Sequence, residues 1–306
     1  MSCSGSGVAF KQGNRMLRYT GSAAPDYSGL LHSETDSFVP TEVVVRREFH
    51  RDLLYADPKS SPSCPTPTNP LIRRLEQFAR LEAADLEALA SLAAGPKAMH
   101  AGQVLVHENG DLDQVYLIVQ GMGCRYKSLP EGQRQILGYL IPGDLCDIHF
   151  ITLTKPDHSV ALICDSQVVK IHTKKVSAVL SSNPRIERAL SLAALQDIAI
   201  LREWLLNVGQ RNALQKLSHF LCEMKLRLSR IGEVADDGSF EFRVNQMALA
   251  DTTGLTPAHV NRTLQRLRND GLIRLRQRRL FVVDADRLAA IAGFDGNYLR
   301  INQCRR

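Results

Sequence analysis

The strongest constraint on the fold comes from residues 245–271, where two short helical patterns meet at a glycine. The first pattern ends at Gly254, a residue that accepts the left-handed backbone that closes many helices. Thr256 can cap the second helix, and Pro257 suits its first turn. Apolar residues then recur at helical spacing, at Val260, Leu264 and Leu267. This segment predicts two short helices joined by a tight turn.

The opposite face of the second helix is polar, which favours a helix-turn-helix that reads DNA. Arginine can bind guanine edges through two hydrogen bonds, and asparagine or glutamine can bind adenine in the same way. The alternative is a pair of helices with a solvated polar face. The candidate DNA-contacting residues on this helix are Thr256, Pro257, Ala258, Asn261, Arg262, Gln265 and Arg266.

An arginine-rich hairpin pattern, LIRLRQRRLFVVD, follows Asp270-Gly271 and resembles the wing of a winged helix. Its arginines suit phosphates better than bases, because a hairpin of this kind positions a protein on DNA but reads little sequence. The candidates are Arg276, Arg278 and Arg279. Residues 243–282 carry eight arginines and two aspartates, so this window alone holds a charge of +6, equal to that of the whole chain. A basic module joined to a neutral remainder is typical of nucleic-acid contact.

The rest of the chain divides into a tail, a β-rich region and long helices. Residues 1–68 are rich in Ser, Gly and Thr and end in a proline-rich run, which predicts a poorly ordered extension and linker. Residues 70–93 have a helical pattern with a break around Leu81, and short strand-like runs with Gly and Pro between them fill 97–172, which predicts a small all-β barrel or roll. An amphipathic helix over 183–209 needs to pack on its own domain or on a second copy. Another helix is expected over 210–228, and a hairpin over 233–244 with Asp237-Gly238 at its turn.

From Asn69 to Asp295 the chain resembles transcription regulators of the Crp/Fnr family. The resemblance lies in AGQVLVHENGDLDQVYLIVQG, in Pro142-Gly143-Asp144 and in LADTTGLTPAHVNRTLQRLRNDGLI. It implies an α+β fold with a sensor over 69–184, formed by a β-roll that is similar to a double-stranded β-helix. A dimerisation helix over 185–208 and a winged helix-turn-helix over 209–306 complete the implied fold. Arg262 falls on the family's base-reading arginine, while Ala258 stands where a glutamate is common. The expected dimer contacts are Leu190, Ala194, Leu201, Leu205 and Val208.

The resemblance weakens at the effector pocket, where cyclic-nucleotide-binding members carry Gly-Glu and then Arg-Ser or Arg-Thr. Here those places read Asp147-Ile148 and His158-Ser159. Ile148 cannot accept a hydrogen bond from a ribose, and His158 replaces an arginine poorly on a phosphate. We therefore expect no cyclic nucleotide in a pocket whose candidate residues are Gly143, Asp144, Asp147, Ile148, His158 and Ser159.

Other cofactors are not expected either. Cys3 and Cys64 are isolated, unlike the cysteine group that holds an iron–sulfur cluster. Cys146 and His149 could ligate haem, although a half-buried thiol and a surface imidazole are the simpler interpretation. The histidines lack the spacing of a metal site, and no catalytic motif is present.

These patterns predict a cytoplasmic regulator that binds a palindromic operator as a homodimer, with an effector or a redox event at the β-roll as a possible control. DNA and a second copy are the expected partners, RNA polymerase is a candidate, and no membrane contact is expected. The alternative function is an effector-binding signalling module without DNA binding.

Overall fold

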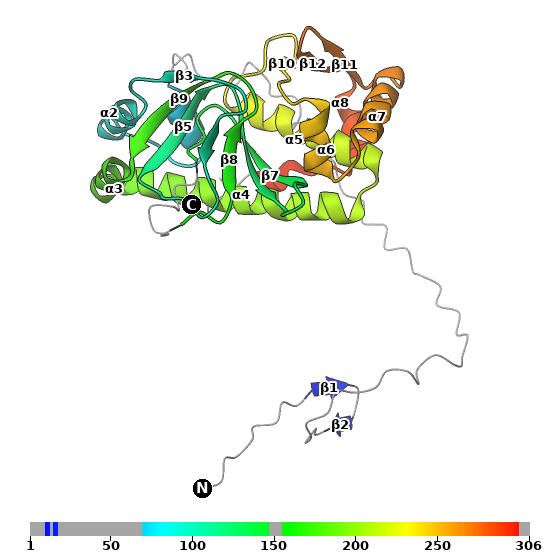
Figure 1. Cartoon of the computed structure of the whole chain (residues 1–306), viewed down its shortest axis with the longest axis horizontal. Helices are drawn as coiled ribbons and strands as arrows, with labels where there is room; N and C mark the ends of the chain where they lie inside the picture. The colour runs from blue at the N-terminus through cyan, green and yellow to red at the C-terminus, as the bar shows by residue number, and fades with distance from the viewer. Residues whose placement is uncertain (1–9, 13–14, 18–68, 147–154, 300–306) are drawn as a thin grey trace. The chain divides into compact units, whose positions relative to one another are not determined.

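The computed structural model describes residues 10–12, 15–17, 69–146 and 155–299, and divides the chain into two units, 1–48 and 49–306. In the first unit, β1 (Phe10–Gln12) pairs antiparallel with β2 (Arg15–Leu17). The rest of the predicted extension over 1–68 lies outside the described residues. All further elements belong to the second unit (Figure 1).

Two short helices open the second unit, and the break that the sequence pattern predicted around Leu81 falls between them. Helix α1 (Pro70–Leu75) begins where the Asn69 side chain accepts a hydrogen bond from the Leu71 amide. Helix α2 (Ala83–Leu92) begins with a capping box between Glu82 and Asp85. This reciprocal cap starts a new helix because it satisfies backbone groups that a continuous helix would bond internally.

Two antiparallel sheets form the β-roll that the sequence predicted. One has the strand order β3-β9-β5 and the other the order β4-β8-β6-β7. Their bounds are β3 (Lys97–Met99), β4 (Val104–Val106), β5 (Gln114–Gln120), β6 (Gly123–Ser128), β7 (Arg134–Leu140), β8 (Ser159–Leu162) and β9 (Ser166–His172). A buried cluster that includes Leu105, Ile118, Val160 and Val168 draws its side chains from both sheets.

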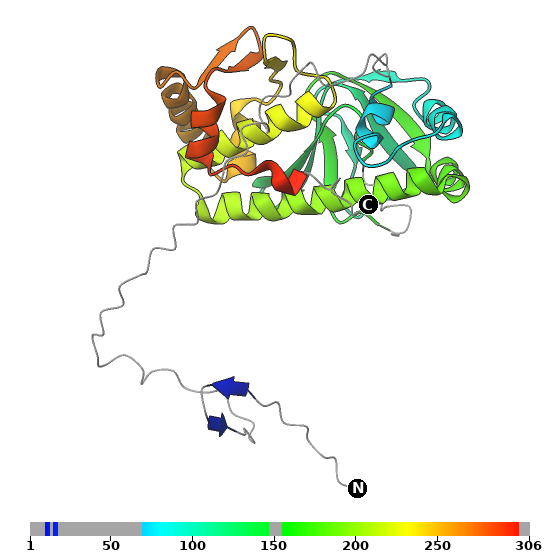
Figure 2. The same ribbon diagram turned by 180° about the vertical axis from the view of Figure 1, so that it is seen from behind.

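Helix α3 (Thr173–Ser182) leads directly into α4 (Pro184–Gln210), which is the long helix predicted over 183–209. Pro184 occupies the first turn of α4, where its missing N–H costs nothing. Both views show α4 running along the sensor and on beneath the C-terminal part of the chain (Figures 1 and 2).

The C-terminal part is a winged helix. It begins with α5 (Ala213–Arg230), which is capped by Asn212 and Gln215, and continues with β10 (Ser239–Glu241), α6 (Gln246–Thr253) and α7 (Pro257–Asn269). The wing consists of β11 (Ile273–Arg276) and β12 (Arg279–Val282), and α8 (Ala285–Ala292) and the 3-10 helix η3 (Gly296–Leu299) follow. Across the predicted turn at Asp237-Gly238, Val234 pairs antiparallel with Phe240 in a short bridge, and β10 also pairs with β12 and completes the wing sheet.

One apolar core continues from the sensor into the winged helix. Tyr139 of β7, Trp204 of α4 and Phe220 of α5 meet there with ring centroids 5.5–6.2 Å apart. The second unit is therefore an α+β body in which α4 and the outer face of β6 and β7 support the winged helix. Among the helices that the structure describes, none has both the length and the apolar composition that crossing a bilayer requires.

Candidate DNA-binding surface and sensor pocket

Local capping sets the geometry of the helix-turn-helix as the sequence indicated. Gly254 ends α6 with a left-handed backbone at φ 66°, where a side chain would be strained. The Thr256 hydroxyl accepts the backbone N–H of His259 at 3.3 Å and begins α7, with Pro257 in the first turn. Val260, Leu264 and Leu267 are buried in the domain core, so the other side of α7 faces outward.

The outward side of α7 carries most of the candidate base-contacting residues. Ala258, Arg262, Gln265 and Arg266 are exposed, as are Thr256 and Pro257. Asn261 is half-buried, and its side-chain carbonyl accepts a hydrogen bond from the Gln246 amide of α6 at 3.3 Å. This face can enter a DNA groove because the apolar side of the helix is already packed against α5 and α6.

The sequence interpretation missed two polar residues beside this face. His259 is exposed in the first turn of α7, between Ala258 and the buried Val260. Gln246 lies at the start of α6, and only the fold brings it to Asn261. The helical period could have drawn attention to His259, whereas no local signal indicates the Gln246 contact.

The wing divides its arginines between two environments. Arg276 and Arg278 are exposed, and Arg278 sits in the hairpin turn with φ 62°. Arg279 instead turns back, and its guanidinium donates to the Ser239 hydroxyl at 2.9 Å and to the Ser239 carbonyl at 3.1 Å. Arg276 and Arg278 are therefore presented to solvent, while Arg279 ties β12 to β10.

The first helix of the motif is docked on the sensor. The Arg134 guanidinium of β7 donates two hydrogen bonds to one carboxylate oxygen of Asp251 in α6, at 2.7 and 2.9 Å. The buried Tyr139 hydroxyl lies 2.8 Å from the Thr252 hydroxyl. These polar contacts add to the shared apolar core, so α6 is held to β7 from two sides.

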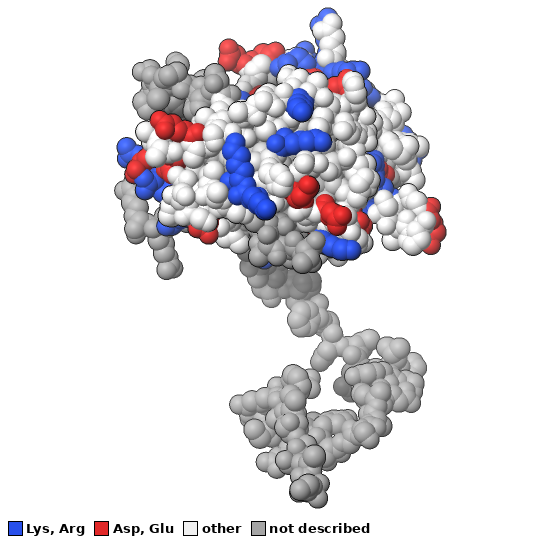
Figure 3. Space-filling view, turned by 60° about the vertical axis from the view of Figure 1, so that its left-hand side comes forward, with Lys and Arg blue, Asp and Glu red and all other residues white. Residues whose placement is uncertain are grey.

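Charge is distributed differently on the sensor. Figure 3 brings forward the sensor side of the molecule, where basic and acidic side chains both lie on a largely uncharged face. On α7 and the wing, by contrast, the exposed charged side chains are mostly arginines: Arg262, Arg266, Arg268, Arg274, Arg276 and Arg278. Phosphate contact is therefore favoured at the winged helix.

The apolar stripe of α4 is split between two environments. Leu190 and Ala194, which were predicted at a dimer interface, are buried in the single chain, and Leu190 belongs to an apolar cluster that α4 shares with the sensor. Leu201 and Leu205 are 48% and 76% exposed, and Val208 is also exposed. Three further apolar side chains on α4 are exposed, Leu195, Ile198 and Leu206. The surface that the helix leaves for a partner therefore lies in its C-terminal half.

A cavity of about 270 Å³ lies between the β-roll and α4. Its apolar wall includes Leu75, Leu137, Leu145, Ile198 and Leu201. Gly143, Asp144 and His158, three of the predicted pocket residues, line it as well. Gly143 has φ 91°, and a Cβ there would collide with the Pro70 carbonyl oxygen, so the Pro142-Gly143-Asp144 turn requires glycine. Ser159 is not among the lining residues, and Asp147 and Ile148 lie outside the described residues.

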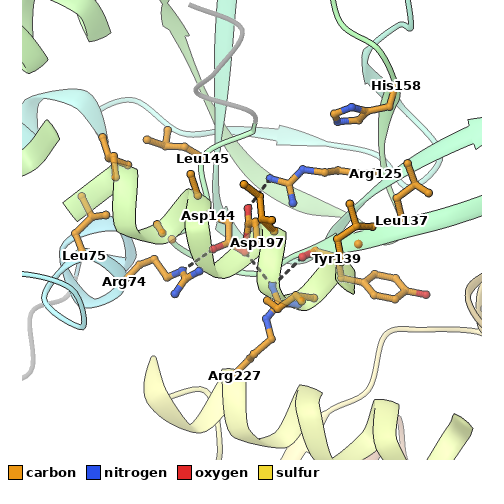
Figure 4. A pocket seen from close by; sticks show the side chains of 18 of the residues that line it. Arg74, Leu75, Arg125, Leu137, Tyr139, Asp144, Leu145, His158, Asp197 and Arg227 are labelled. Atoms are coloured by element: carbon orange, nitrogen blue, oxygen red, sulfur yellow. Dashed lines mark hydrogen bonds and ion pairs between the residues drawn. The ribbon is translucent and has the colours of Figure 1, made fainter. Parts of the chain in front are cut away.

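Each arginine in the cavity wall is paired with a carboxylate, as the dashed lines in Figure 4 show. Asp144 is buried and accepts from Arg74 at 2.7 Å and from Arg227 at 3.3 Å. Burial alone would raise the pKa of Asp144, but the two guanidinium groups outweigh it and hold that pKa below its usual value.

Of the other two pairs, one joins β6 to α4, and the other lies in the segment directly before β8. Arg125 of β6 donates to Asp197 of α4 at 3.2 Å, and the two side chains point toward each other in Figure 4. His158 Nδ1 lies 2.7 Å from Asp157 Oδ1. The pairing leaves the wall electrically balanced and does not create a cationic pocket.

Cys146, one of the two haem-ligand candidates, is buried, and His149 lies outside the described residues. Burial also raises the pKa of the Cys124 thiol to about 11 and that of Cys222 to about 12. Cys124 and Cys222 are therefore protonated at neutral pH and are poor nucleophiles.

Sequence-family comparisons agree with this geometry. The family model described as the Crp-like helix-turn-helix domain matches residues 215–291, and the cyclic nucleotide-binding domain model matches residues 96–183. The two matches fall on the β-roll and, after it along the chain, on the winged helix, which is the order of domains in Crp/Fnr regulators. The chain belongs to the Crp/Fnr family of transcription regulators.

Relatives support the same assignment. The regulator is 28% identical to the transcriptional activatory protein AadR of Rhodopseudomonas palustris over 74% of this chain and 92% of that protein. It is 25% identical to the transcriptional activator FnrL of Cereibacter sphaeroides, over 66% of this chain and 82% of that protein. It also shares the fold of FixK2 from Bradyrhizobium japonicum, with a TM-score of 0.59 at 21% identity over 66% of this chain and 98% of that one. The protein is therefore a DNA-binding transcription regulator.

In this regulator the fold also assembles pocket residues that the sequence interpretation missed. Arg125 and Asp197 lie 72 positions apart, and Arg74 and Arg227 reach Asp144 from two different helices. No motif marks them, because each belongs to an otherwise ordinary strand or helix. The pairs exist only through the long-range packing of α1, α4 and α5 around the β-roll.

Proposed function

We propose that two copies of the regulator pair through α4 and bind a twofold-symmetric operator, with one α7 in each of two adjacent major-groove turns. The observation that carries this proposal is the presence of two separate outward surfaces on one body. The polar face of α7 suits DNA, and the apolar stripe in the C-terminal half of α4 suits a second copy. The half-sites should lie about 34 Å apart along the duplex.

The spacing of the exposed stripe supports pairing of two α4 helices. Ile198, Leu201, Leu205 and Val208 follow steps of three, four and three residues. Such a pattern keeps apolar side chains on the seam of a two-helix coiled coil. Covering these side chains would stabilise the dimer by about 25 cal/mol for each Å² of apolar surface removed from water.

Sequence reading would come from α7 and affinity from the wing. The exposed Arg262 can donate two hydrogen bonds to a guanine, while Arg276 and Arg278 suit phosphates. Ala258 has no hydrogen-bonding group in its side chain. Its position would therefore distinguish this operator from one that is read by a glutamate at the same place.

We propose that DNA binding requires no cyclic nucleotide, haem or iron–sulfur cluster. A cyclic phosphate in the cavity would have to compete with Asp197 for Arg125, or with Asp144 for Arg74 and Arg227. The Asp144 pairs are buried and therefore costly to break, and Arg125 would have to give up a partly exposed pair, so these residues do not fit a cyclic nucleotide well. An effector of different chemistry, or a redox event at the β-roll, is the remaining route of control.

The proposed activity is binding and not catalysis. Its partners would be DNA, a second copy and RNA polymerase, and the operator would be met in the cytoplasm of a bacterial cell. The alternative function, a signalling module that binds an effector without DNA, has less support because it leaves the arginine-rich α7 and wing without a role.

The decisive experiment is the selection of fragmented genomic DNA by the purified full chain, with no ligand and with added cyclic AMP in parallel. We expect a twofold motif in both arms, with the same enrichment. Enrichment only with cyclic AMP would contradict the ligand proposal. No enrichment from a folded dimer in either arm would favour the signalling-module alternative.

A further inference from the structure

Residues 294–299, here called the C-terminal strap, follow α8 and return to the long helix α4. Figure 2 shows this segment, in red, against α4, and Figure 1 agrees from the other side. The helix-turn-helix family match ends at residue 291, so the strap lies outside both matched regions.

The strap is bonded to the middle of α4. The Gln196 side-chain amide donates to the Leu299 carbonyl at 2.5 Å, and both residues are buried. Gln196 is adjacent to Asp197, which pairs with Arg125 in the sensor cavity. One turn of α4 therefore contacts the sensor cavity through Asp197 and the strap through Gln196.

The same strap is bonded to α5, the first helix of the DNA-binding domain. Arg230 donates to the Leu299 carbonyl at 2.6 Å, and the Tyr298 hydroxyl donates to Glu223 at 2.7 Å. Glu223 is fully buried and also accepts from the indole of Trp204 in α4, at 3.0 and 3.2 Å.

Close packing reinforces these bonds. The Phe294 and Tyr298 rings both pack on the buried imidazole of His219, with centroids 5.1 and 6.1 Å away. At Gly296 a Cβ would lie 2.8 Å from Leu226, so the backbone of the strap itself approaches α5 closely. The strap is thus an ordered part of the domain boundary.

The direction of α5 relative to α4 depends on how far apart the points are at which the two helices are joined. The chain passes from α4 to α5 through Arg211 and Asn212, and close to that end the Trp204 indole of α4 also donates to Glu223 of α5. The strap adds a connection at Gln196, 14 residues before the end of α4 at Gln210, which is about 21 Å along the helix. Two points this far apart define the direction of α5 relative to α4.

We propose that the C-terminal strap is a positioning element that sets the angle between the DNA-binding domain and α4, and thereby the half-site spacing that the dimer accepts. This inference rests on the proposed function, because the spacing depends on α4 pairing. Adding one base pair between half-sites turns one of them by about 35° and moves it by about 3.4 Å. A dimer whose domains are held at a fixed angle should reject such an operator.

The test uses two variants of the full chain and two controls. Ending the chain after Gly293 removes the strap, and ending it after Asn302 is the control, because it loses Arg305 and Arg306 but keeps Leu299 within the peptide chain. The double variant Gln196→Met and Tyr298→Phe keeps side-chain volume but removes two of the bonds. Gln210→Met, at an exposed position of α4, is its control.

Two readouts are measured on each protein. The first is the emission of Trp204, the only tryptophan in the sequence, which reports on the α4–α5 junction without DNA. The second is the ratio of affinities for the selected operator and for operators with one base pair added or removed between half-sites. We expect strap variants to shift Trp204 emission to longer wavelength and to reduce this ratio by about tenfold.

Each outcome decides the proposal. Loss of spacing selectivity in both strap variants, with dimerisation and binding to a single half-site retained, supports it. An unchanged ratio in the double variant, or an equal loss in the controls, overturns it. A wild-type chain that binds no twofold site contradicts the proposed function, and this inference with it. Strap variants that bind the operator normally and keep the spacing selectivity of the wild type contradict this inference alone.

Discussion

At the scale of single residues, Arg262 should carry more of the sequence preference than any neighbour. It is exposed on the outward side of α7, and its guanidinium can bind the two acceptors of a guanine at once. Arg262→Ala should weaken specific binding by about 1–3 kcal/mol and relax one base position in each half-site.

Binding titrations on the selected operator and on its single-base variants measure both effects. Arg188→Ala, at an exposed position of α4 on the sensor side, is the matched control. An equal loss on every sequence would remove Arg262 from base reading and assign it to phosphate contact.

The charge of Asp144 contributes to stability. It balances Arg74 and Arg227 in a buried position, and these guanidinium groups keep its pKa below the usual value. Asp144→Asn leaves two buried cations with less compensation, so we expect a loss of about 3–5 kcal/mol in the free energy of unfolding. Urea denaturation measures this loss, with the exposed Asp236→Asn as control.

The pH dependence of this effect follows from the direction of the pKa shift. A carboxylate whose pKa is lowered by folding contributes stability that is fully present above its unfolded value, near 3.9, and that disappears as pH falls through the folded value. The difference in the free energy of unfolding between wild type and Asp144→Asn, here called the gap, should therefore be constant from pH 7 to pH 5. A gap that closes already between pH 7 and pH 5 would contradict the ion-pair explanation.

At the scale of elements, α4 shows where sequence periodicity stops being informative. The period identified one apolar stripe from Ile186 to Val208, but Leu190 and Ala194 pack into the sensor while Leu201 and Leu205 remain exposed. The helix meets the β-roll along its N-terminal half and the winged helix along its C-terminal half. Which leucines remain for a partner depends on those contacts, and they involve residues far away in the sequence.

Leu201→Asp should shift the protein from dimer to monomer, because it places a charge in the exposed stripe that a second α4 would cover. Sedimentation velocity at several concentrations measures the change. Leu129→Asp is the control, since Leu129 is 61% exposed between β6 and β7. A Leu201→Asp protein that remains dimeric would mean that the interface lies on another element.

The wing should act through charge. Arg278 is exposed at its turn, so Arg278→Ala should weaken binding on all sequences and reduce the slope of log affinity against log salt by about one. Arg279→Ala is an informative comparison, because Arg279 is bonded to Ser239 and its loss should act on the wing sheet. Titrations at several salt concentrations measure the slope, and an unchanged slope for Arg278→Ala would separate that residue from the phosphates.

At the scale of the whole molecule, local signals predicted more of the fold than of its connections. Gly254, Thr256 and Pro257 identified the helix-turn-helix because caps act within a few residues. The Arg125–Asp197 pair and the strap contact of Gln196 with Leu299 join residues 72 and 103 positions apart. Such pairs have no local signature, so the balanced cavity and the attachment of the strap to α4 could be recognised only in the structure.

The continuous core leads to a prediction about unfolding. Tyr139 of the sensor, Trp204 of α4 and Phe220 of the winged helix pack together, and Arg134 joins β7 to Asp251. Separating the two domains would expose these rings to water and break the hydrogen bond between the Tyr139 and Thr252 hydroxyls. The sensor and the winged helix should therefore unfold as one cooperative unit.

Urea unfolding followed by Trp204 fluorescence and by far-UV circular dichroism, at one protein concentration, should give coincident transitions. Tyr139→Phe removes the 2.8 Å contact with Thr252 while it keeps the ring, so it should lower the common midpoint by an amount equivalent to about 1 kcal/mol. Because the apolar contacts remain, the two transitions should still coincide in this variant. Separate transitions in the wild type would mean that the shared core does not couple the domains, and that the winged helix is stable without its contacts to β7.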